Sequence, residues 1–125
     1  MNTLKKLPIF LLLITFILYG LYNTMIYYNG YCYYGTHGIK VSELIIVTSK
    51  SNSIDYCRML RESFNDDRIF SELISLEFYD GSAIDHSSVV RDLYNYYGSE
   101  IFWNRAKSLD RESKELVKIY LDFNR

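Results

Sequence analysis

His86 and its neighbours form the group of side chains in this sequence best suited to catalysis. The neighbours are two aspartates and three serines, Asp80, Ser82, Asp85, Ser87 and Ser88. A serine hydrolase would need one hydroxyl against the imidazole, a carboxylate that orients the ring and an oxyanion site. Serine and aspartate are also common helix caps, and a histidine is ordinary in a first turn. We expect the structural role, with a small hydrolase centred on His86 as the alternative.

Neither a metal site nor a cofactor site is expected. Asp80, Asp85 and His86 form one cluster without a second contributor, whereas a metal centre draws its ligands from more than one segment. His37 lies in a glycine-containing segment that lacks the Lys-Ser/Thr ending of a phosphate loop. The sequence therefore indicates no metal, no cofactor and no small-molecule substrate.

The two cysteines, Cys32 and Cys57, allow two interpretations. In an oxidising compartment, a disulfide between them would tie the linker to the first helical hairpin. Closing a loop of this size contributes about 3 kcal/mol, which matters for a small core. Alternatively, Cys57 is a small buried hydrophobic side chain, because it shares a helical face with Leu60 and Phe64. The sequence favours the two interpretations about equally.

Aromatic side chains supply most of the candidate partner-binding residues. The chain contains 13 tyrosines and a single tryptophan, Trp103. Trp103 suits the core, but an exposed tryptophan would be the first hot-spot candidate, because tryptophan and tyrosine are enriched at interaction hot spots. We expect another exported protein to be contacted by Trp103, Tyr94, Tyr97 and His86.

The first 39 residues indicate a membrane segment. Lys5 and Lys6 are followed by no charged residue until Lys40. Residues 7–28 make a helix long enough to cross the hydrocarbon core of about 30 Å, at about 1.5 Å per residue. The lysines predict a cytoplasmic N-terminus and a single pass through a bacterial inner membrane, with the rest of the chain outside. The alternative is a cleaved signal peptide, although no A-x-A-like site follows the apolar run.

Three regions are predicted: a membrane anchor or signal segment over 1–28, a Tyr/Gly-rich linker over 29–41 and an exported α-helical domain over 42–125. The last region is long enough for one small domain. Residues 40–125 contain 12 Lys and Arg against 15 Asp and Glu, a net charge of −3. Nucleic-acid binding needs a basic face, so it is not expected.

Apolar spacing and capping residues predict about six short helices in the exported domain. They are expected after Ser42, over 54–64, from Asp66 to near Tyr79, from Ser82 to Tyr97, from Ser99 to Ala106, and after Asp110. Residues 43–48 are β-branched and suit a strand equally well. Asp80-Gly81 is predicted to be a turn, and Gly98 is predicted to end the fourth helix. The expected fold is an all-α bundle of three antiparallel helix pairs.

Three segments resemble HEAT-type helical hairpins of small exported bacterial proteins. They are Leu76–Ala83, Tyr97–Phe102 and Leu116–Leu121. The resemblance covers residues 42–123 and implies stacked αα-hairpins that form a scaffold for binding, with no catalytic residues. The chain is too short for three full repeats, so a compact bundle is the alternative.

Together these features favour a non-enzymatic, membrane-tethered module that binds another exported or envelope protein in the periplasm. One version is an immunity or inhibitor protein that masks a toxin or hydrolase. An assembly factor for an envelope complex is the alternative within the same class. Residues 7–28 would contact the membrane, and cleavage after them would release the domain into the periplasm.

Overall fold

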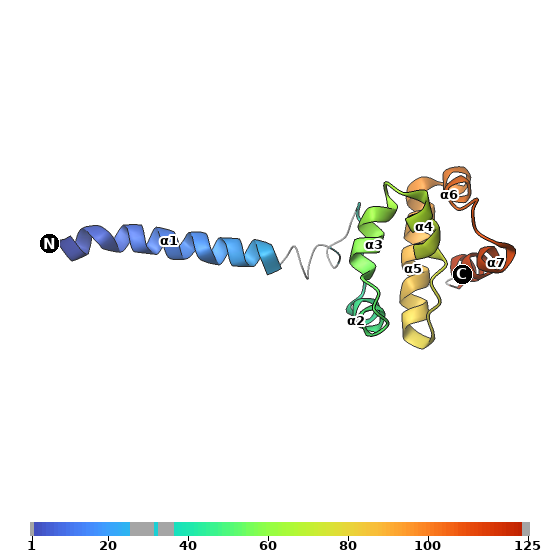
Figure 1. Ribbon diagram of the computed structural model, residues 1–125, viewed down its shortest axis with the longest axis horizontal. Coiled ribbons are helices and arrows are strands. Elements are labelled where there is room, and N and C mark those ends of the chain that lie inside the picture. Colours follow the sequence, from blue (N-terminus) through green and yellow to red (C-terminus); the bar gives the residue numbers. More distant parts are fainter. Residues whose placement is uncertain (1, 26–31, 33–36, 124–125) are drawn as a thin grey trace. The chain divides into compact units, whose positions relative to one another are not determined.

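The computed structural model describes residues 2–25, 32 and 37–123. The chain divides into two compact units, residues 1–31 and 32–125 (Figure 1). All regular secondary structure in the described ranges is helical, with one helix in the first unit and six in the second. The expected all-α class is therefore confirmed, and residues 43–48 are helical.

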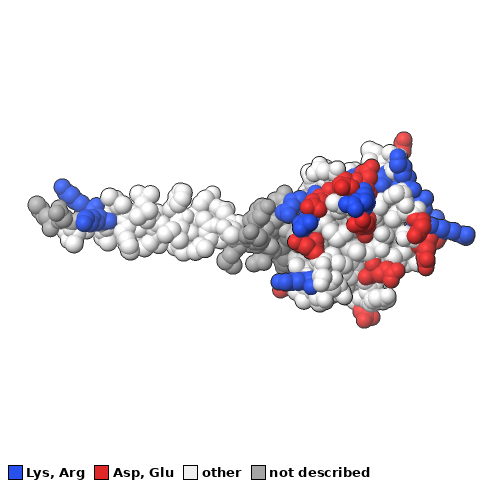
Figure 2. Space-filling view, viewed as in Figure 1, with Lys and Arg blue, Asp and Glu red and all other residues white. Residues whose placement is uncertain are grey.

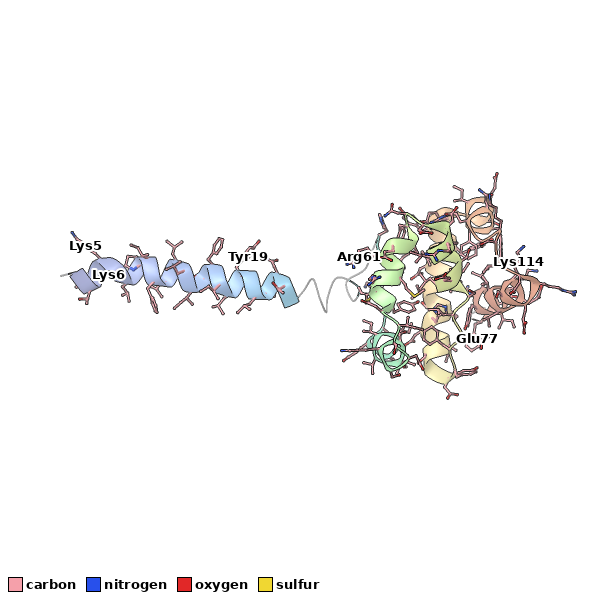
Figure 3. All side chains as sticks on the ribbon, in the orientation of Figure 1. Lys5, Lys6, Tyr19, Arg61, Glu77 and Lys114 are labelled. Atoms are coloured by element: carbon pink, nitrogen blue, oxygen red, sulfur yellow. A yellow bond between two sulfur atoms is a disulfide. The ribbon has the colours of Figure 1, made fainter. Side chains whose placement is uncertain are left out.

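The first unit contains the helix α1, Asn2–Met25. All of its side chains over residues 3–24 are exposed. Lys5 and Lys6 lie at its start, and the remaining surface carries neither basic nor acidic groups (Figures 2 and 3). Among the described residues this is the one helix long and apolar enough to cross a membrane, a test that an N-terminal signal sequence also passes. Positions 26–28 of the predicted segment lie outside the described residues, as does most of the predicted linker.

The second unit contains six helices. They are α2 Glu43–Ser51, α3 Tyr56–Ser63, α4 Asp67–Ile74, α5 Asp80–Tyr97, α6 Ser99–Arg105 and α7 Arg111–Asp122. α5 is the longest of them and contacts α2, α6 and α7, whereas α3 packs mainly on α4. The bundle is thus built around α5, and the expected arrangement of stacked consecutive hairpins is not confirmed.

Side-chain caps explain where four of these helices begin. The Ser42 hydroxyl accepts a hydrogen bond from the Ile45 N–H at 3.2 Å, as predicted for α2. Asp66 and Asp110 accept backbone hydrogen bonds at the starts of α4 and α7, also as predicted. Asp55 caps α3, so this helix begins after the predicted position 54.

Two predicted boundaries around α5 are wrong. α4 ends at Ile74 rather than near Tyr79, because the Tyr120 hydroxyl donates to the Leu76 carbonyl at 2.6 Å and accepts from the Phe78 N–H at 3.2 Å. These bonds hold residues 76–79 out of a helix. Asp80-Gly81 is the start of α5 rather than a turn before it, and the chain changes direction at Asp80, whose φ is 54°.

The core of the second unit draws side chains from all six helices. Its largest fully buried apolar members are Ile45, Tyr56, Leu60, Phe70, Leu73, Ile74, Val89, Val90, Leu93, Phe102 and Val117. Gly98 joins α5 to α6 with a φ of 80°, a left-handed conformation that favours glycine. This junction turns α6 away from α5, so that Phe102 reaches the core while its neighbour Trp103 is half-buried at the edge.

Candidate binding cleft

A cleft of about 360 Å³ lies between α5, α6 and α7. Its lining residues are Arg91, Tyr94, Asn95, Trp103, Lys118, Leu121 and Asp122. The residues from α5 are spaced i, i+3, i+4, and so are those from α7. Each helix therefore turns one face toward the cleft. Two predicted partner-binding residues, Tyr94 and Trp103, are brought together here.

The aromatic rings of the cleft are anchored on the core. Tyr94 and Trp103 both make edge contacts with the fully buried Phe102, with ring centroids 5.2 Å and 5.3 Å apart. Edge-to-face pairs at these distances are favourable, and packing against the core restricts ring movement. The cleft therefore presents two half-buried rings whose positions are set before any partner binds.

Arg91 forms part of the cleft wall and joins α5 to α7. Its Nη2 donates to the carbonyl of Leu121 in the last turn of α7, where a cation is favourable. Its Nε is buried and has no hydrogen-bond partner among the described residues. Partial burial raises the pKa of the adjacent Asp92, and the charge of Arg91 opposes this rise. The guanidinium thus retains an unmet donor, which is uncommon for a buried polar atom.

Tyr97, the third predicted contact residue, belongs to a different cluster. Its hydroxyl accepts a hydrogen bond from Arg105 Nη1 at 2.7 Å, and its ring packs edge-on against Phe70. Partial burial raises the pKa of Tyr97, while the charge of Arg105 acts in the opposite direction. Tyr97 therefore has a structural partner, and it does not line the cleft.

Arg105 lies in a charged stretch of the chain, but it is not on a solvated face. Only 11% of its side chain is exposed, and the guanidinium lies over the rings of Phe70 and Tyr97 at 4.5 Å and 4.9 Å. It also donates to the Ser63 carbonyl and pairs with Asp67 at 2.7 Å. Arg105 thus joins the end of α3 to α4, α5 and α6. Local charge patterning gives no signal for this role, because the partners are distant in sequence.

His86 is fully buried in the second turn of α5, rather than in a first turn near the surface. Its Nδ1 is hydrogen-bonded to the Tyr56 hydroxyl at 2.8 Å, and the rings of Phe78 and Tyr120 lie 4.8 Å and 4.9 Å away. Burial lowers the pKa of His86 to about 4, and the Ile74 carbonyl opposes part of this shift. Nε2 has no partner in hydrogen-bonding geometry among the described residues. His86 is thus a core residue, and its burial removes it from the partner-binding surface.

The serines near His86 do not form a catalytic arrangement with it in the described part of the chain. Ser82 is hydrogen-bonded to Thr48 at 3.1 Å, and Ser87 donates to the Ile84 carbonyl at 2.7 Å. Neither serine is joined to the imidazole. The described residues also contain no group of three or more His, Cys, Asp or Glu side chains placed to hold a metal ion.

Cys32 and Cys57 are brought together at disulfide distance, with their Cα atoms 5.1 Å apart. Cys32 is buried, and Cys57 lies in the first turn of α3. The cysteine pair therefore encloses α2 in a loop. Ile39 and Val41 of this loop are also buried, so the chain is packed against the domain before α2 begins.

The chain matches no family model, no curated protein and no solved structure. The HEAT-type resemblance therefore stays a prediction.

Proposed function

We propose that this protein is a non-enzymatic, membrane-anchored domain that binds another exported or envelope protein through the α5–α6–α7 cleft. The observation that carries this proposal is the meeting of Arg91, Tyr94 and Trp103 around one cleft. Arginine, tyrosine and tryptophan are the residue types most enriched among interaction hot spots. The cleft, of about 360 Å³, has room for side chains of a partner.

The proposed location is the outer face of a bacterial inner membrane. α1 has the length and composition of a membrane span, and Lys5 and Lys6 favour a cytoplasmic N-terminus. The cysteine pair at disulfide distance fits an oxidising compartment. The intact mass of protein from the membrane fraction tests whether residues 1–28 are retained as an anchor.

Within this class we favour an immunity or inhibitor protein that masks a toxin or hydrolase acting in the periplasm. Small size and a compact helical domain support this version, and they fit an envelope assembly factor as well. The identity of the bound protein distinguishes the two. A hydrolase centred on His86 is not favoured, because the imidazole is fully buried and lies outside the cleft.

The test is capture of the partner by the full-length, C-terminally tagged protein from cross-linked native cells, with a matched pair of variants on α6. Trp103→Ala removes a ring from the cleft, while Ile101→Ala removes an exposed apolar side chain that does not line it. We expect one dominant exported partner, whose recovery falls at least about tenfold in Trp103→Ala and is unchanged in Ile101→Ala.

Circular dichroism of both variants separates lost binding from lost folding. A Trp103→Ala protein that folds normally and recovers the same partner at the wild-type level would refute the role of the cleft. Recovery of no specific partner by the wild-type protein would count against the binding function itself.

A further inference from the structure

We infer that the cleft accepts an acidic side chain of the partner that stands next to an apolar one. This inference rests on the proposed function and defines the chemistry of the partner segment. Two cations, Arg91 and Lys118, line the cleft against one carboxylate, Asp122. The surrounding region, residues 40–125, carries a net charge of −3 from 12 basic and 15 acidic residues. The lining of the cleft thus has one more basic than acidic side chain, in a region whose net charge is negative.

The arrangement of polar and apolar groups specifies the pair of partner side chains. Trp103, Tyr94 and the half-buried Leu121 offer an apolar surface, while Arg91 and Lys118 lie on the α5 and α7 sides. A partner carboxylate can meet these cations while its apolar neighbour packs on the rings. A basic partner segment would face the two cations and lose affinity, since like charges brought together at an interface are unfavourable.

Lys118 can exchange its partner for an anion, and Arg91 adds positive charge to the cleft. Arg91 donates from Nη2 to the Leu121 carbonyl, and its buried Nε is out of reach of a partner, so it contributes mainly its positive charge. Lys118 contacts Glu115 at 3.1 Å, and both side chains of this pair are more than half exposed. Exposed pairs of this kind hold their partners weakly and exchange easily. A carboxylate that enters the cleft can therefore compete with Glu115 for Lys118, and the positive charge of Arg91 on the α5 side favours the same anion.

The experiment is a selection of random 12-residue peptides on the full-length protein in detergent micelles, followed by titration of the best peptide. Trp103 is the single tryptophan in the chain, so its fluorescence reports binding at the cleft directly when the peptide lacks tryptophan. Each titration is repeated with a peptide in which Glu or Asp is replaced by Gln or Asn. The protein variants are Lys118→Glu and, as a matched control one turn earlier on α7, Lys114→Glu (Figure 3).

We expect enriched peptides that carry an acidic residue beside an apolar one. We also expect about tenfold weaker binding when the acid is replaced by its amide or when Lys118→Glu is used, with Lys114→Glu close to wild type. Equal affinity for the acid and amide peptides, no enrichment, or equal effects of both lysine variants would overturn the inference. If one of these outcomes occurs while Trp103→Ala still loses the native partner, only the inference about the acidic side chain fails and the proposed function stands. If the capture test itself fails, the proposed function is refuted, and the inference that rests on it falls as well.

Discussion

Arg105 and Arg91 lie in two regions of the same bundle and show how differently one residue type can be used. Arg105 makes hydrogen bonds to Tyr97 and Ser63, pairs with Asp67 and covers two aromatic rings. Arg91 makes one hydrogen bond, to Leu121, and keeps a buried Nε without a partner in the described structure. The Arg105 region is a closed structural cluster, and the Arg91 region is an open cleft.

The comparison shows that aromatic and arginine residues alone do not identify a binding site. Both regions contain tyrosine rings beside a guanidinium, but the donors of Arg105 are occupied by groups of the chain itself. Of the two regions, the Arg91 region is the one that combines a cleft with half-buried rings. The relevant signal is therefore a guanidinium that lines open space beside half-buried rings, rather than the residue types alone.

The largest expected effect on stability comes from Arg105→Met. This substitution removes three hydrogen-bonding partners and two cation–π contacts from a largely buried site, and we expect the free energy of unfolding to fall by about 4 kcal/mol. Arg91→Met loses a single bond and should lower it by about 1 kcal/mol. Urea denaturation followed by circular dichroism measures both changes. Equal losses would break the distinction between the closed cluster and the open cleft.

Loss of the cysteine pair should have the next largest effect on the free energy of unfolding. If Cys32 and Cys57 are bonded, their sequence separation of 25 makes Cys57→Ser less stable by about 3 kcal/mol, because the unfolded chain regains loop entropy. Reduction of the wild-type protein should produce the same loss and should not change the Cys57→Ser variant. Mass spectrometry under non-reducing conditions shows whether the bond is present. A stability unaffected by reductant would favour the buried-thiol interpretation of Cys57.

His86 should make the free energy of unfolding depend on pH, with an effect of intermediate size. Its pKa is lowered by burial from 6.5 to about 4, so the unfolded state binds a proton at higher pH than the folded state. The associated stability is present above pH 6.5 and is lost as the pH falls toward 4. Between pH 7 and pH 5 we expect the free energy of unfolding to fall by about 2 kcal/mol from this group.

The matched control for this measurement is the second histidine of the chain. His86→Gln should remove most of the pH-dependent loss, whereas His37→Gln, at an exposed position, should keep it. Unchanged pH dependence in His86→Gln would show that other groups dominate acid unfolding. Partner capture by His86→Gln should remain normal, since His86 is fully buried and does not line the α5–α6–α7 cleft.

Local sequence signals were sufficient for most helices of the domain. The caps Ser42, Asp66 and Asp110 act within three residues of their own positions, so sequence patterns could locate them. The end of α4 could not be located in this way, because Tyr120 holds Leu76 from 44 residues away. The start of α5 could not be located for a related reason: Asp80-Gly81 follows residues 76–79, whose conformation depends on the distant Tyr120.

The candidate site was predictable only in part. Tyr94 and Trp103 were selected by residue type, and the structure brings them to one cleft. The same criterion selected Tyr97, whose hydroxyl is bound by Arg105, and His86, which is buried. Arg91 was missed because its position opposite Leu121 depends on the packing of α5 against α7. Residue type thus gives candidates, and tertiary contacts decide which of them remain available.

Lys118→Ala is expected to have the smallest effect on stability. Because a residue that lines an open cleft should not be needed for folding, this variant tests whether the cleft is open. Lys118 and Glu115 are exposed by 56% and 61%, and exposed ion pairs contribute little. The free energy of unfolding should change by less than about 0.5 kcal/mol, similar to Glu115→Gln, when both are measured by urea denaturation. A loss of stability close to that of Arg105→Met would make Lys118 a structural residue. It would contradict the distinction between an open cleft and a closed cluster. A neutral result with reduced partner capture would assign its charge to binding.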